Sequence, residues 1–123
     1  MLDMSMFREH ADVLRADHDK REMPHDNIDE VIRLDEEWRQ ARYDVDQLRK
    51  KRNEAARGIA EAKKSGDSAA ADSILAEVAS LGQEIDAQSE KVDSCLAERD
   101  AIRMRVPNIL HDSVPVGEDD QKN

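Results

Sequence analysis

Aromatic residues are nearly absent from this chain of 123 residues, which contains one Trp, one Tyr and one Phe. A compact globular domain of this length normally buries several aromatic side chains, because each removes a large area from water. Strand signals are also lacking, since β-branched residues nowhere alternate with polar ones over several positions. Charged residues make up 39% of the chain, and Leu, Ile, Val and Ala recur among them at regular spacing. This combination favours long helices over both a compact globule and a disordered chain.

Cysteine and long apolar runs are scarce as well. Cys95 is the only cysteine, so no intramolecular disulfide can form, and a reducing, cytoplasmic location is the simple interpretation. No apolar run approaches the roughly 18 residues of a membrane-spanning helix, and the first residues lack the apolar stretch of a signal peptide. The net charge of −10 argues against indiscriminate nucleic-acid binding, but it allows a local basic site.

Three parts are expected along the chain. Residues 1–26 should form a base, with one short helix from Met4 to about Arg21 and a turn at Pro24. Residues 27–106 should form a helical hairpin, and residues 107–123 an extended linker, because the last stretch has no helical period. We expect this linker to lead into a larger protein. The expected buried side chains of the short helix are Phe7, Val13 and Leu14.

The hairpin is predicted from two apolar heptad patterns, in helices expected at about residues 28–64 and 69–105. In the first helix, nine of ten heptad positions over five heptads are apolar. Its two rows are Val31, Trp38, Val45, Arg52 and Ile59, and Leu34, Ala41, Leu48, Ala55 and Ala62. The rows of the second helix are Ile74, Leu81, Gln88, Cys95 and Ile102, and Val78, Ile85, Val92, Arg99 and Val106. The sequence therefore predicts an all-α fold, a long antiparallel two-helix coiled-coil hairpin with a short N-terminal helix at its base.

The tip of the hairpin is expected at residues 65–68. Gly66 offers a left-handed helix stop, and Asp67 or Ser68 can cap the second helix. Folding the chain back at Gly66 brings every seam position of one helix opposite a seam position of the other. Arg52 and Arg99 fall in the rows by count, so we expect each to pack its stem and extend its guanidinium into solvent.

Positive charge gathers on one flank of the first long helix. Residues 39–64 contain nine Lys and Arg against four acids, whereas residues 67–102 contain nine acids and two basic residues. With the Val31 row at heptad position a, positions e and f carry most of these cations and one aromatic residue. We call the following residues the basic stripe: Arg42, Tyr43, Arg49, Lys50, Arg57, Lys63 and Lys64. The acids lie at b, c or g, and Asp46 and Glu54 are expected on the opposite face.

Two interpretations of the basic stripe stay open on this evidence. It can be a solvated face whose charges pair with acids of the partner helix. Alternatively, a row of cations roughly 30 Å long suits a nucleic-acid backbone, whose charges repeat along its length. An elongated arm of this kind would recognise the shape, sugars and phosphates of RNA. No catalytic or metal-binding residue is predicted, since the chain has no glycine-rich phosphate loop and no nucleophile–base pair.

Four stretches give the chain a family resemblance: "MLDMSMFRE", "IDEVIRLDEEWR", "LRKKRNEAARGIAEAKKSGD" and "RVPNILHDSVPVGEDDQKN". With these stretches, the chain resembles the N-terminal tRNA-binding arm of seryl-tRNA synthetases over essentially its whole length. The most specific motifs are Leu-Arg-x-x-Arg-Asn at residues 48–53 and the Pro-Asn…Ser-Val-Pro-Val-Gly segment at 107–117. The resemblance implies that the hairpin docks the long variable arm and elbow of serine tRNA. Where the family often has Ser-Lys, this chain has Ala56-Arg57.

The resemblance also implies a class II catalytic domain beyond Asn123, which uses ATP and Mg to attach serine to the tRNA. The arm itself is expected to be non-catalytic, to need no cofactor and to be a monomer, with a homodimeric parent protein. Two other functions stay open: a structural coiled-coil spacer, and a hairpin that clasps a protein client. A client-clasping hairpin predicts an apolar tip, whereas residues 63–68 are polar.

Overall fold

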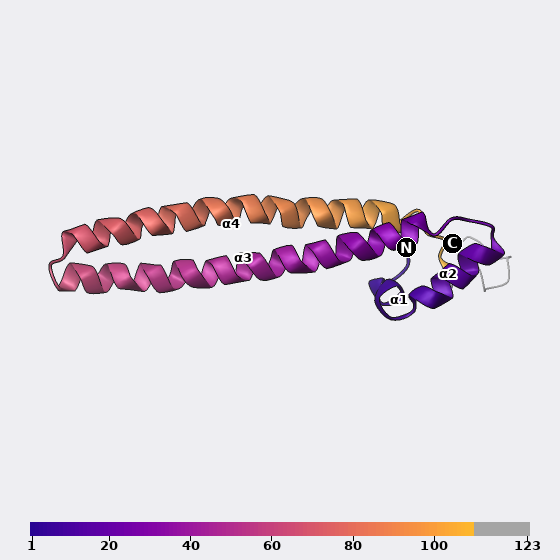
Figure 1. Cartoon of the computed structure of the whole chain (residues 1–123), viewed down its shortest axis with the longest axis horizontal. Helices are drawn as coiled ribbons and strands as arrows, with labels where there is room; N and C mark the ends of the chain where they lie inside the picture. Colours follow the sequence, from indigo (N-terminus) through magenta and orange to yellow (C-terminus); the bar gives the residue numbers. More distant parts are fainter. Residues whose placement is uncertain (110–123) are drawn as a thin grey trace. The chain divides into compact units, whose positions relative to one another are not determined.

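The computed structural model describes residues 1–109, which form helices and contain no strand (Figure 1). The helices are α1 (Met4–Glu9), α2 (Ala11–Lys20), α3 (Asp26–Lys64) and α4 (Ser68–Arg103). The expected all-α fold with a long helical hairpin is confirmed. Most of the predicted linker, residues 110–123, lies outside the described residues, and the three-part division of the chain stays a prediction.

The chain splits into two compact units, which are described here in turn. The hairpin unit is Glu37–Cys95, and the terminal unit combines Met1–Glu36 with the described residues from Leu96 onward. In the hairpin unit, α3 and α4 run antiparallel on either side of a tight turn (Figure 1). Each long helix continues beyond this unit into the terminal unit.

The turn of the hairpin forms as the sequence predicts. Gly66 has a φ of 76°, in the left-handed region that a residue without a Cβ adopts at little cost. The N–H of Asp67 donates to the Ala62 carbonyl at 2.9 Å, which satisfies one of the last carbonyls of α3. The Asp67 carboxylate accepts from the N–H of Ala70 at 3.0 Å and so caps the start of α4.

The seam follows the predicted heptads. All twenty predicted seam positions are buried or half-buried, and none is exposed. Gly58, which lies beside the seam, has a packing reason, because a Cβ at this position would lie 3.2 Å from Cδ1 of Ile74. The helices approach closely there, as expected from small residues beside a coiled-coil seam.

The terminal unit has a largely aliphatic core with a single aromatic side chain. Its buried residues are Leu2, Met4, Phe7, Leu14, Ile28, Val31 and Val106, with Met6, Ile32, Ile102 and Ile109 packed against them. These residues come from the segment before α1, from α1 and α2, from the first turns of α3, from the last turn of α4 and from the segment after it. Side chains far apart in the sequence therefore share one core, which removes apolar surface from water although the chain has so few aromatic residues.

The prediction of one N-terminal helix from Met4 to Arg21 is wrong. His10 adopts φ −131° and ψ 35°, which separates α1 from α2. Beyond the break, Leu14 and His18 share the inner face of α2 and are fully buried, whereas Val13 is 44% exposed. Burial of Val13 was therefore also wrongly predicted.

A buried charge cluster corrects the expectation for Arg99, which does not extend its guanidinium into solvent. Arg99 is 6% exposed, and its Nη1 donates to Oδ1 of Asp35 at 2.8 Å. Arg8 donates to the same carboxylate from Nε and Nη2, at 2.9 and 2.8 Å. This hydrogen bonding to Asp35 raises the pKa of the Arg8 guanidinium. Asp35 lies one position beyond the Leu34 seam position, which places a carboxylate where Arg99 can reach it inside the protein.

Candidate nucleic-acid interface

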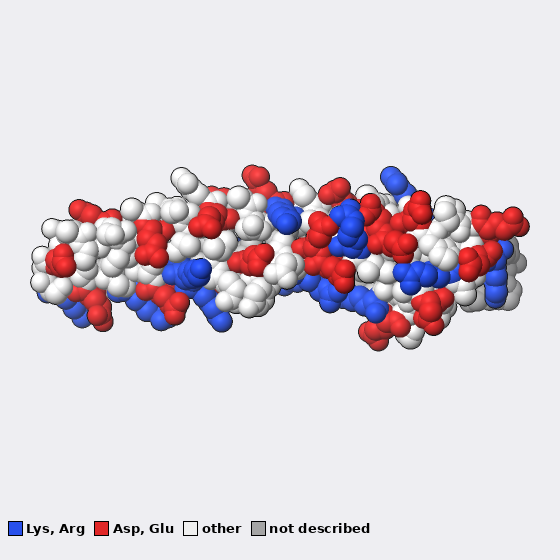
Figure 2. Space-filling model, in the orientation of Figure 1, with Lys and Arg blue, Asp and Glu red and all other residues white. Residues whose placement is uncertain are grey.

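The basic stripe lies on α3, within the hairpin unit, and all seven of its residues are exposed. Tyr43, the aromatic member, is 59% exposed. Figure 2 shows that Lys and Arg of the hairpin unit gather along the side of α3, while Asp and Glu are spread over α4. An exposed row of cations can contact a large anionic partner without first breaking a buried interaction.

Arg42 is held in position by Trp38. The guanidinium carbon of Arg42 lies 4.8 Å from the centroid of the Trp38 ring, in cation–π geometry. Trp38 is a half-buried seam residue four positions earlier on α3, so its ring has a fixed place. The interaction reduces the conformational freedom of Arg42 and lowers the entropic cost of ordering this side chain on a ligand.

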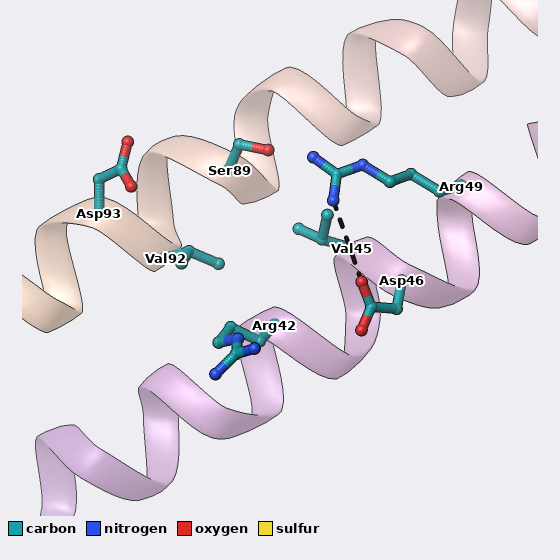
Figure 3. A pocket seen from close by; sticks show the side chains of 7 residues that line it. All are labelled: Arg42, Val45, Asp46, Arg49, Ser89, Val92 and Asp93. Atoms are coloured by element: carbon teal, nitrogen blue, oxygen red, sulfur yellow. Dashed lines mark ion pairs between the residues drawn. The ribbon is translucent and has the colours of Figure 1, made fainter.

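A hollow of about 270 Å³ opens between the two helices beside the stripe (Figure 3). Four side chains of α3 and three of α4 line it: Arg42, Val45, Asp46, Arg49, Ser89, Val92 and Asp93. Val45 and Val92 are its apolar members, and they occupy seam positions. In Figure 3, the Arg49 side chain extends over Val45 toward Ser89 of α4. Arg49 is therefore the cation of the stripe that approaches α4, and Arg42 lines the hollow from α3.

The position of Asp46 corrects one expectation. We expected this residue on the face opposite the stripe, but it lines the hollow and its Oδ1 lies 3.9 Å from Nη1 of Arg49 (Figure 3). The cause is helix geometry, because at about 100° per residue heptad position b lies between positions e and f. A helical-wheel projection of the sequence would have shown this. One acid, Asp46, thus lies on the same face as the cations of the stripe.

Other kinds of site find no support in the described part of the chain. Residues 1–109 contain no group of three or more His, Cys, Asp or Glu that could hold a metal ion. Among the helices of the same range, none is long and apolar enough to cross a membrane. Cys95 is buried, as its seam position predicts. The stripe residues therefore remain the candidate site, and their role stays a prediction.

Comparison with known proteins places the chain among synthetase domains. Residues 1–110 match the family model of the seryl-tRNA synthetase N-terminal domain. The chain is 38% identical to a serine–tRNA ligase of Thermococcus onnurineus and 40% identical to one of Methanoregula boonei, in each case over the whole chain. It is 31% identical to the serine–tRNA ligase of Haloquadratum walsbyi, again over its whole length.

A solved structure is similar over the same extent. The crystal structure of seryl-tRNA synthetase from Pyrococcus horikoshii, complexed with ATP, matches the whole chain with a TM-score of 0.83 and 34% identity. The chain covers 28% of that structure, and it covers 27% of the Thermococcus and 29% of the Methanoregula relative. It thus spans less than a third of the length of these relatives.

Proposed function

We propose that this chain, which belongs to the family of seryl-tRNA synthetase N-terminal domains, binds serine tRNA through its basic stripe. One observation carries the proposal. In a chain of net charge −10, all seven stripe residues are exposed on α3 within the hairpin unit. The acidic remainder of the surface repels RNA, so the stripe is the surface on which an RNA backbone is attracted.

The contacts are to phosphates rather than to bases. Arg and Lys along a helix match the repeating charges of a backbone, and such contacts fix register and orientation without reading sequence. The long variable arm and elbow of serine tRNA form an extended anionic surface of this kind. By docking them, the hairpin would orient the tRNA so that its acceptor end reaches a catalytic domain of the larger protein.

In that larger protein, a class II catalytic domain would join serine to the tRNA with ATP and Mg²⁺. This chain would contribute binding and orientation, with no catalytic residue and no cofactor of its own. RNA affinity distinguishes this function from the two alternatives, because neither a structural spacer nor a protein-binding hairpin needs to bind RNA.

The test is a gel shift of the chain with serine tRNA over a series of KCl concentrations. In a plot of the logarithm of the binding constant against the logarithm of the salt concentration, each phosphate contact contributes about −0.7 to −0.9 to the slope. Reversal of two stripe charges, Arg49→Glu with Arg57→Glu, is expected to weaken binding at least tenfold and to flatten the slope by about two contacts. Serine tRNA without its variable arm is expected to bind the unchanged chain more weakly.

The matched control is Lys51→Glu with Lys91→Glu, which changes the net charge equally. Both lysines are exposed and occupy g positions of their helices, away from the stripe. Binding by the control is expected to fall by less than about threefold. If the control weakened binding as much as the stripe variant, only net charge would matter. If neither variant weakened it, the hairpin would be a spacer.

A further inference from the structure

We propose that the RNA backbone lies along the groove on one defined side of the hairpin unit, with a phosphate held between Arg42, Arg49 and the hydroxyl of Ser89 on α4. The inference rests on the proposed function and deepens it, because it adds α4 to the interface. It also selects the e positions of α3 over the f positions as the centre of binding.

The first support is the charge on this side of the hairpin. On α3, the e positions hold three cations in the hairpin unit: Arg42, Arg49 and Lys63. In the heptad frame of α4 with Val78 at position a, the e positions within the hairpin unit are Ser68, Leu75, Gly82 and Ser89, none of which is charged. Ser89 lines the same hollow as Arg42 and Arg49, so the two e rows border one groove. We call it the e groove.

The opposite side of the hairpin unit is acidic. The g positions of α3 and α4 hold four acids against two lysines: Glu37, Asp44, Glu77 and Glu84, with Lys51 and Lys91. An RNA backbone would be repelled there and attracted to the e groove. α4 places no acid at its e positions, and the carboxylate that it contributes to the hollow, Asp93, comes from a b position.

The chemistry of the hollow suits a phosphodiester. Two guanidinium groups and one hydroxyl offer the donors that phosphate oxygens accept, and arginine presents them in a planar fork. Val45 and Val92 offer an apolar floor for the carbons of a sugar. At about 30 Å³ per water molecule, a volume of about 270 Å³ leaves room for a phosphate group.

Gly82 is the second support. It lies in the interior of α4, where glycine costs about 1 kcal/mol relative to alanine. No steric demand explains it, because a Cβ at this position would meet nothing within 4 Å. In this it differs from Gly58, which packs against Ile74. A glycine at the e position of α4 leaves the groove open to the close approach of another backbone.

Asp46 and Asp93 also line the hollow, and their carboxylates oppose a phosphate. Asp46 lies 3.9 Å from Arg49, so it competes with the phosphate for this guanidinium. The proposal therefore predicts a gain of affinity: Asp46→Asn should tighten serine-tRNA binding by about two- to fivefold.

The main experiment compares Ser89→Asp with Ser80→Asp in the whole chain, with serine tRNA as the probe. The two variants add the same charge to α4, but Ser80 is exposed at a c position, away from the groove. Ser89→Asp is expected to weaken binding about tenfold or more, and Ser80→Asp by less than threefold.

A second experiment uses no charge at all. Gly82→Gln places a side chain in the groove, and Ala87→Gln places the same side chain at an exposed c position of α4. Gly82→Gln is expected to raise the melting temperature, since glutamine is the better helix former, and yet to weaken RNA binding about threefold or more. Ala87→Gln is expected to leave RNA affinity unchanged. A loss of affinity together with a gain of stability cannot come from misfolding.

The outcomes separate this inference from the function on which it rests. If Arg49→Glu with Arg57→Glu weakens binding while Ser89→Asp behaves like Ser80→Asp, the e groove is excluded and tRNA binding stands. The e groove is equally excluded if Gly82→Gln leaves affinity unchanged. If neither the stripe variant nor Ser89→Asp weakens binding, both proposals fail.

Discussion

Oδ1 of Asp35 accepts a hydrogen bond from Nη1 of Arg99 at 2.8 Å, across 64 residues of sequence. Both side chains are buried in the terminal unit, where Asp35 is 1% exposed. Arg8 adds a bidentate contact to the same carboxylate, although its own side chain is 38% exposed. One buried carboxylate thus connects residues near the N-terminus, near the start of α3 and near the end of α4.

Removing this carboxylate should be costly. Asp35→Ala removes the buried carboxylate that pairs with the Arg99 guanidinium, which keeps its contacts to the partly exposed Asp100. The expected loss is up to about 3–5 kcal/mol of unfolding free energy. Arg8 contributes less to this loss, because its partly exposed guanidinium can be hydrated. Urea denaturation followed by circular dichroism measures the difference.

The matched double variant is Asp35→Leu with Arg99→Leu, which removes both buried charges. It should be clearly more stable than Asp35→Ala, since a buried ion pair replaced by apolar side chains often costs little. A double variant no more stable than the single one would show that the geometry of the cluster, rather than charge compensation, holds this region together.

The fold of the hairpin could be predicted because its signals are local and repetitive. Twenty seam positions repeat one rule, and Gly66 with Asp67 marks the only turn that rule requires in the described chain. The break at His10 and the burial of Arg99 could not be predicted in this way. The burial of Arg99 depends on Asp35, a partner 64 residues away in the sequence that no heptad count reveals.

The candidate site shows the same division. The exposure of all seven stripe residues follows from their heptad positions. The hollow does not, because it depends on how Ser89 and Val92 of α4 lie against α3. The place of Asp46 has a simpler reason, since at about 100° per residue its b position lies between the e and f positions of the stripe.

The tip offers a test of backbone strain without side-chain interference. Gly66 has a positive φ, and a Cβ there would meet nothing within 4 Å, so Gly66→Ala changes the backbone cost alone. The expected loss is about 1–2 kcal/mol of unfolding free energy. Gly66→Asn should lose less, because asparagine tolerates the left-handed region better than alanine. Equal stability of all three proteins would mean that the turn adopts another conformation at no cost.

The two helix-interior glycines should respond differently to alanine. Gly82→Ala is expected to stabilise the chain by about 0.5–1 kcal/mol, since the new methyl group meets open space. Gly58→Ala should gain less or lose stability, because its methyl group would lie 3.2 Å from Cδ1 of Ile74. Thermal denaturation of the two variants measures the difference, and equal gains would show that the helices separate readily at Gly58.

Trp38 provides an optical signal for RNA binding, because it is the only tryptophan of the chain and lies 4.8 Å from the Arg42 guanidinium. If Arg42 contacts phosphate, the cation moves or changes its hydration, and the emission of Trp38 should change as serine tRNA is added. The change should saturate with the same midpoint as a gel shift at equal salt. Arg42→Ala should remove most of this emission change, although the variant should still bind serine tRNA with reduced affinity.

The control for this signal is Lys64→Ala, which removes a stripe cation at the far end of α3. Lys64 lies 26 positions after Trp38 on one continuous helix, so at about 1.5 Å per residue the two are roughly 39 Å apart. Lys64→Ala should therefore weaken binding but keep the full fluorescence change at saturation. If Lys64→Ala weakened binding while Trp38 emission stayed unchanged at saturating serine tRNA in the unsubstituted chain, RNA would bind near the tip and would not reach Arg42. In that case, the e groove at Arg42 and Arg49 would not be the binding surface.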